Sequence, residues 1–76
     1  MEELIFYIVK NIVSKPEDVR VEDGGDREGA KVYNLIVAEE DKGFVIGRQG
    51  RVAKALRSIV KAAASKENLK INIDII

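Results

Sequence analysis

The chain has 76 residues, enough for one domain, because chains divide into separate cores only well above about 150 residues. It contains neither cysteine nor histidine, which excludes disulfides, thiol chemistry, zinc sites of the usual ligand types, and Ser/His or Cys/His catalytic pairs. With 46% hydrophobic residues, 34% charged residues and zero net charge, the composition is typical of a globular protein rather than a disordered segment.

We expect a soluble, cytoplasmic protein that folds as a single domain over residues 1–76. No apolar run approaches the roughly 20 residues that cross a bilayer, and no basic-then-apolar leader opens the chain. Nothing in the residue types indicates a metal site, a cofactor or an enzyme. We therefore look for a binding function.

The first half of the chain predicts a helix followed by a β-hairpin. Residues 3–13 place apolar side chains at helical spacing, and this helix should end before Pro16. Residues 18–22 alternate as a short strand, and residues 31–38 are rich in β-branched and aromatic side chains. Residues 23–30 contain three glycines and predict a long, mobile loop between the strands.

The second half predicts two helices and a strand. Residues 39–46 form a short helix that opens with three acidic residues, which suit a helix N-terminus because they cap free amides and oppose the dipole. Gly47 and Gly50 interrupt this helix, and a long helix follows over residues 51–65. Residues 69–75 alternate between apolar and polar side chains, as expected of a strand with one buried face.

The resulting order, α-β-β-α-α-β, defines the topology of a small sheet. A hairpin makes the first two strands antiparallel, and a helical crossover lets the third strand run parallel to the second. We therefore predict a two-layer α+β fold, with a three-stranded mixed sheet and all helices on one face. Residues 31–38 should be the central strand.

The zero net charge conceals a strong segregation along the chain. Residues 1–41 carry five basic and eleven acidic side chains, a net charge of −6. Residues 42–66 carry seven basic side chains and no acidic one, a net charge of +7. Such a basic block is typical of a surface that binds a polyanion, although a solvated face without a partner has the same pattern.

A Gly-x-x-Gly motif, Gly47-Arg48-Gln49-Gly50, lies between the two predicted helices at the start of this block. The motif alone is weak, since short glycine pairs are common by chance. Its position matters more, because glycine lets the chain turn sharply and lets another backbone approach closely. The amides that open the following helix lack internal partners and can donate to phosphate oxygens, and arginine can bind phosphate with two bonds.

The long helix separates basic from apolar residues. On a helical wheel, its basic side chains fall within an arc of about 120° at ~100° per residue, and these residues are Arg51, Lys54, Arg57 and Lys61. Arg51 and Lys54 are nearest to the glycine turn, whereas Lys61 is too far along the helix to contact the same phosphates. The apolar arc covers about 200°, wider than one core contact needs.

Residues 43–57, GFVIGRQGRVAKALR, closely resemble the RNA-binding KH domain, and the predicted strand order is that of its bacterial type II form. The resemblance extends over nearly the whole chain. In length and in its tail, IVKAAA, the chain is most similar to the small stand-alone KH proteins of bacteria, the KhpA type.

This resemblance implies binding of single-stranded RNA, with about four nucleotides clamped along their backbone and the bases in a shallow groove. The RNA-binding residues it implies are Ile46, Gly47, Arg48, Gln49, Gly50, Arg51 and Lys54. Val45 and Val52 are further candidates for the apolar groove floor, with core packing as the alternative.

The resemblance also implies partners and a cellular role. The expected partners are single-stranded RNA and either a second copy or a larger KH-containing protein of the KhpB type, with Ile59, Ala62 and Ala63 as candidate dimer contacts. The implied roles are RNA chaperoning, post-transcriptional regulation, and control of cell elongation, cell shape and wall synthesis.

Two other classes of function stay open from the residues alone. The chain could be a protein-assembly module with little affinity for RNA. Alternatively, its helix–glycine–helix segment could bind duplex DNA as a helix-turn-helix does, although the glycines at both ends of the turn argue against it. Modules that stack bases on a sheet need paired aromatic residues, and only Tyr33 is available, which we expect to pack inward.

Overall fold

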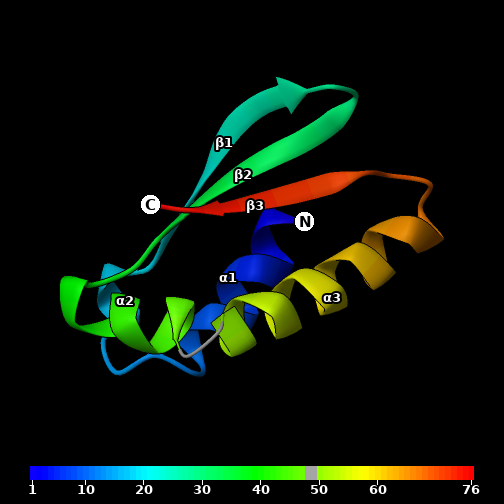
Figure 1. The fold of residues 1–76 in the computed structure, drawn as a ribbon. Helices are drawn as coiled ribbons and strands as arrows, with labels where there is room; N and C mark the ends of the chain where they lie inside the picture. The colour runs from blue at the N-terminus through cyan, green and yellow to red at the C-terminus, as the bar shows by residue number, and fades with distance from the viewer. Residues whose placement is uncertain (48–49) are drawn as a thin grey trace.

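The computed structural model describes residues 1–47 and 50–76, and it has the predicted order of elements (Figure 1). The elements are α1 (Glu2–Lys10), a short 3-10 helix η1 (Pro16–Asp18), β1 (Arg20–Arg27), β2 (Ala30–Ile36), α2 (Glu39–Ile46), α3 (Arg51–Lys66) and β3 (Ile71–Ile75).

The three strands form one mixed sheet in the order β1-β2-β3, as the connections predict. β1 is antiparallel to β2, with Val21 opposite Leu35, and β2 is parallel to β3, with Tyr33 opposite Ile73. The helices lie together on one side of the sheet (Figure 1). The two-layer α+β architecture is therefore confirmed, and β2 is the central strand.

The core lies between the sheet and the helices. Ile5 and Val9 of α1, Leu35 of β2 and Val60 of α3 have no exposed surface. Enclosing each such side chain contributes about 1.5–3 kcal/mol to folding. Tyr33 packs against this cluster, as expected, so no aromatic side chain of β2 is presented for base stacking.

The predicted long loop over residues 23–30 is wrong. β1 continues to Arg27, with a bulge between Asp23 and Asp26, and a tight turn at Glu28 and Gly29 returns the chain to β2. Both turn residues have positive φ, +53° and +84°, as in the two-residue turns that match the twist of a hairpin. Glycines that indicated a loop in the sequence instead accommodate the bulge and the turn.

Several predicted element ends also differ. α1 ends at Lys10 instead of residue 13, and one further turn is made by the amides of Ile12 and Val13, which both donate to the Val9 carbonyl. β3 begins at Ile71 instead of residue 69, which leaves Leu69 half-exposed in the connection.

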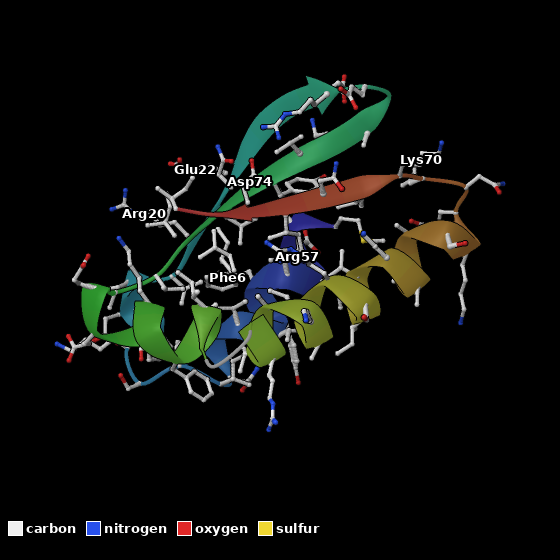
Figure 2. All side chains as sticks on the ribbon, in the orientation of Figure 1. Phe6, Arg20, Glu22, Arg57, Lys70 and Asp74 are labelled. Atoms are coloured by element: carbon white, nitrogen blue, oxygen red, sulfur yellow. The ribbon has the colours of Figure 1, made fainter. Side chains whose placement is uncertain are left out.

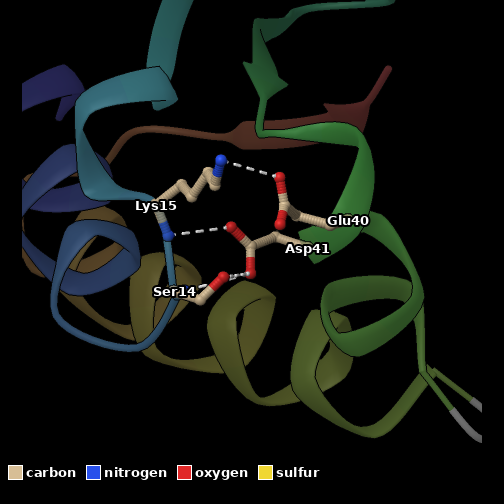
Figure 3. A network of polar contacts seen from close by, with 4 residues as sticks. All are labelled: Ser14, Lys15, Glu40 and Asp41. Atoms are coloured by element: carbon tan, nitrogen blue, oxygen red, sulfur yellow. Dashed lines mark hydrogen bonds and ion pairs between the residues drawn. The ribbon is translucent and has the colours of Figure 1, made fainter.

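The three acidic residues lie in the first turn of α2, as predicted, but the expected side-chain cap is not made. Ala38 occupies the N-cap, and Asp41 is buried, with 4% of its surface exposed. Its carboxylate accepts hydrogen bonds from the Ser14 hydroxyl (2.7 Å) and from the backbone amides of Ser14 and Lys15 (both 3.0 Å) (Figure 3). Lys15 also pairs with Glu40 at 3.1 Å. This network fastens α2, and thus the turn after it, to the segment that follows α1.

The same contacts shift two pKa values. The hydrogen bond from the Ser14 hydroxyl, and then those from the two amides, lower the pKa of Asp41 below its ordinary value. The hydrogen bond and charge of Glu40 raise the pKa of Lys15. Both shifts favour the charged forms, so the network is complete at neutral pH.

Candidate nucleic-acid interface

Gly47 ends α2 in a conformation that requires glycine. Its φ is +55° and its ψ is −174°, and its amide donates to the Gly43 carbonyl at 2.8 Å. A Cβ at this position would lie 2.9 Å from the Phe44 carbonyl oxygen, closer than real Cβ contacts. The first glycine of the motif therefore serves the sharp turn out of α2.

Gly50 serves a different purpose. It is the N-cap of α3 and adopts the left-handed conformation, with φ +67°. A Cβ built on it would meet nothing within 4 Å, so the space beside this backbone is open. Its amide reaches the Gly47 carbonyl only at 3.5 Å, the limit of a hydrogen bond. The start of α3 thus has a weakly bonded Gly50 amide beside open space, as at helix N-termini that bind anions.

Arg48 and Gln49, the two central residues of the predicted site, lie outside the described residues. Arg51 begins α3 and is exposed, and Lys54 is exposed one turn further along. Ile46, the last residue of α2, is 50% exposed immediately before the turn. The described site residues therefore gather at the junction of α2 and α3.

α3 presents three distinct faces. The face toward the sheet is buried and comprises Ala53, Leu56, Val60 and Ala64. One flank is basic and turns toward β3; we call it the basic flank, and it comprises Lys54, Arg57 and Lys61. The opposite flank is apolar and partly exposed, and it comprises Val52, Ala55 and Ile59.

Arg57 fixes the position of the basic flank. Its Nε and Nη2 atoms both donate to the Ile73 carbonyl, at 3.3 and 3.2 Å, across the space between α3 and β3 (Figure 2). A guanidinium has five N–H donors, so this contact leaves others available. Arg57 was not among the predicted site residues; its spacing of three from Lys54 was the only sequence signal, and it did not indicate a contact with β3.

The two valines suggested for the groove floor lie elsewhere. Val45 is 1% exposed and belongs to the core. Val52 is half-buried on the apolar flank, where it lines a hollow of about 260 Å³ between the three helices; the hollow is also lined by Ile8, Ile12, Phe44 and Ile59. Core packing, the alternative, is thus correct for Val45, and Val52 faces this apolar hollow.

Two negative findings complete the description. In residues 1–47 and 50–76, acidic side chains nowhere form a group of three that could hold a metal ion. Within the same residues, no helix has the length and apolar character needed to cross a membrane.

Comparison with known proteins identifies the family. The family model described as KhpA/KhpB, KH domain matches residues 2–75. Among similar curated proteins, the RNA-binding protein KhpA of Clostridium perfringens is 51% identical over the full length of both chains. The KhpA proteins of Listeria monocytogenes and Chlamydia trachomatis are 49% and 40% identical, covering at least 99% of this chain and 95% of theirs. No solved structure matches. With its α-β-β-α-α-β order, mixed sheet and glycine turn, the chain belongs to the KhpA/KhpB family of type II KH domains.

Proposed function

We propose that the protein binds single-stranded RNA at the junction of α2 and α3 and that it is a binding module rather than an enzyme. The observation that carries the proposal is the open space beside Gly50, the N-cap of α3: a Cβ built on it would meet nothing within 4 Å, and Arg51 and Lys54 supply positive charge beside it. The relatives' name, RNA-binding protein KhpA, supports it.

In this proposal, the backbone of about four nucleotides lies along residues 47–50. Arg48 and Arg51 pair with phosphates, Gln49 and Lys54 contact the strand beside them, and Ile46 supplies apolar surface for a base. The groove runs between this junction and the free edge of β3, where Arg57 holds the two sides together. With two to four phosphates neutralised, affinity should be modest and fall with salt at a slope of about −0.7 per phosphate.

The test is the double variant Arg48→Asp/Gln49→Asp. A matched control is Lys10→Asp/Asn11→Asp, which also converts a cation and its neighbouring amide to acids, but at the exposed end of α1. Fluorescence anisotropy with a labelled single-stranded tetranucleotide RNA should show binding by the wild type and the control, and none by the first variant. Equal binding by both variants would remove the site assignment.

A second proposal concerns assembly. Ile59 and Phe44 are each 51% exposed beside the apolar hollow, and Ile12, which also lines it, is 41% exposed, so exposed apolar side chains gather at this hollow. We propose that this apolar flank of α3, with Ala62 and Ala63, contacts a second copy or a larger KH-containing protein of the KhpB type. Two copies held together would bind one RNA more tightly than a single copy, because binding of the first raises the effective concentration of the second near the strand.

Ile59→Asp tests the assembly proposal. The wild type should sediment as a dimer and the variant as a folded monomer, because a buried carboxylate at a symmetric contact would be unpaired. A dimer that persists in the variant would place the interface on another surface. If the protein dimerises but no RNA binds even at low salt, assembly alone is its function.

For the cell, we propose a cytoplasmic RNA chaperone and post-transcriptional regulator linked to cell elongation and wall synthesis. Sequencing RNA crosslinked to the wild type and to the Arg48→Asp/Gln49→Asp variant in their own cells tests this role, and the variant should lose the crosslinks and alter cell shape. Competition between duplex DNA and single-stranded RNA tests the remaining alternative, that the protein binds duplex DNA as a helix-turn-helix does. The protein should bind the RNA more tightly.

A further inference from the structure

A second hollow lies at the far end of the basic flank, between the C-terminal half of α3 and the start of β3. It is an open hollow with a volume of about 440 Å³. Lys61 and Ser65 line it from α3, Leu69 and Lys70 from the connection, and Ile71 and Asn72 from β3. Lys70 immediately precedes β3 (Figure 2).

This hollow is in line with the proposed RNA site. Arg57, Lys61 and Ser65 follow one another at intervals of four, so they share one flank of α3. Arg57 reaches β3 at Ile73, and the hollow reaches β3 at Ile71, two residues earlier in the strand. Since α3 and β3 run side by side in opposite directions (Figure 1), the hollow lies on the same side of α3 as Arg57, farther from Gly50 along the helix. Lys61 is about 16 Å from Gly50 along the helix, at 1.5 Å per residue.

The lining has the chemistry that single strands require. Among the described residues, the ion pairs involve Lys15, Arg27, Lys31 and Lys42, and none involves Lys61 or Lys70. Two ammonium groups are therefore available for phosphates. Leu69 is 50% exposed and offers apolar surface to a base, while the Ser65 hydroxyl and Asn72 amide can bond to base edges. Such a combination of cations and base-contacting surface is typical of sites that track a single strand.

We infer that this hollow is a second nucleotide-binding site on the same strand, so that the protein holds a longer single-stranded RNA than the tetranucleotide at the glycine turn. The inference rests on the proposed function. It predicts that Lys61 and Lys70 contribute only when the strand is long enough to reach them.

The experiment compares labelled tetranucleotide and octanucleotide RNAs of randomised sequence, by anisotropy over a range of salt. Each phosphate contact adds about 0.7 to the slope of log affinity against log salt, so two extra contacts should steepen the slope for the octanucleotide by about 1.4. When the salt concentration rises fourfold, the affinity for the octanucleotide should therefore fall about sevenfold more than the affinity for the tetranucleotide. Lys61→Ala/Lys70→Ala should lose this extra slope and the tighter binding of the octanucleotide, while its affinity for the tetranucleotide stays that of the wild type. Lys10→Ala/Arg20→Ala, which removes the same charge from α1 and β1, should keep the octanucleotide advantage.

The outcomes separate the two claims. If the wild type does not bind the tetranucleotide, the site at the glycine turn is wrong. If it binds the tetranucleotide but gains nothing from the octanucleotide, or if Lys61→Ala/Lys70→Ala keeps the whole gain, the second site is wrong and the first stands. Equal losses on both RNAs would mean that the lysines act only through overall charge, and would also overturn the inference.

Discussion

Replacing Gly47 by alanine should destabilise the fold, whereas the same change four residues earlier should stabilise it. The backbone of Gly47, with φ +55° and ψ −174°, lies in a region that costs other residues about 1–3 kcal/mol. The new Cβ would also meet the Phe44 carbonyl at 2.9 Å, and that oxygen cannot retreat without disturbing the last turn of α2. For 76 residues, a total stability of about 4–11 kcal/mol is expected, so the loss would be a large share.

Gly43 and Gly50 are the matched controls for this prediction. Gly43 lies within α2 with nothing within 4 Å of a built Cβ, so alanine should stabilise the protein by about 0.5–1 kcal/mol. At Gly50 only the left-handed conformation is penalised, at about 1–2 kcal/mol, because the space is open. Urea unfolding followed by circular dichroism should rank the proteins Gly43→Ala, wild type, Gly50→Ala, Gly47→Ala. A Gly47→Ala protein as stable as the wild type would refute the reasoning.

Three further predictions concern the rest of the structure. Because the folded-state pKa of Asp41 is lowered, its contribution to stability is present above the ordinary carboxyl pKa of about 3.9 and is lost as pH falls through the lower folded value. Asp41→Asn should therefore be less stable than the wild type at pH 7 and lose less stability in acid, and an unchanged pH profile would contradict this. Leu35→Ala should lose about 2–5 kcal/mol in urea unfolding, since Leu35 has no exposed surface, and a loss below 1 kcal/mol would mean that the core is looser than described. Arg57→Gln should weaken binding of the tetranucleotide RNA severalfold while the free energy of unfolding changes little, because the two bonds to Ile73 cross the groove at a partly exposed position. Unchanged affinity would remove Arg57 from the site.

The order of elements and the sheet topology followed from sequence because periodic burial dominates both. The alternation around Leu35 and the helical spacing of Ile5 and Val9 each match a period that only one kind of element satisfies. The hairpin was mispredicted because a glycine permits a loop and a bulge equally well. Only the pairing of β1 with β2 beyond Asp23, which is a tertiary contact, distinguishes the two.

The candidate site, too, could be predicted from sequence only where its features are local. Glycines that bracket a turn between helices could be recognised from sequence, but their separate needs, a backbone clash at Gly47 and open space at Gly50, required coordinates. Asp41 fitted the pattern of a helix cap, yet its carboxylate bonds to residues 26 and 27 positions away. The contact of Arg57 with β3 spans 16 positions, and no local pattern encodes such a contact.

The most direct test of the RNA site is an amide chemical-shift titration of the ¹⁵N-labelled protein with the tetranucleotide RNA. The largest changes should fall on Gly50, Arg51 and Val52 at the start of α3, and smaller ones on Lys54 and Arg57. Changes confined to α1 and β1, or none at RNA concentrations that saturate anisotropy, would contradict the assignment of single-stranded RNA to the glycine turn.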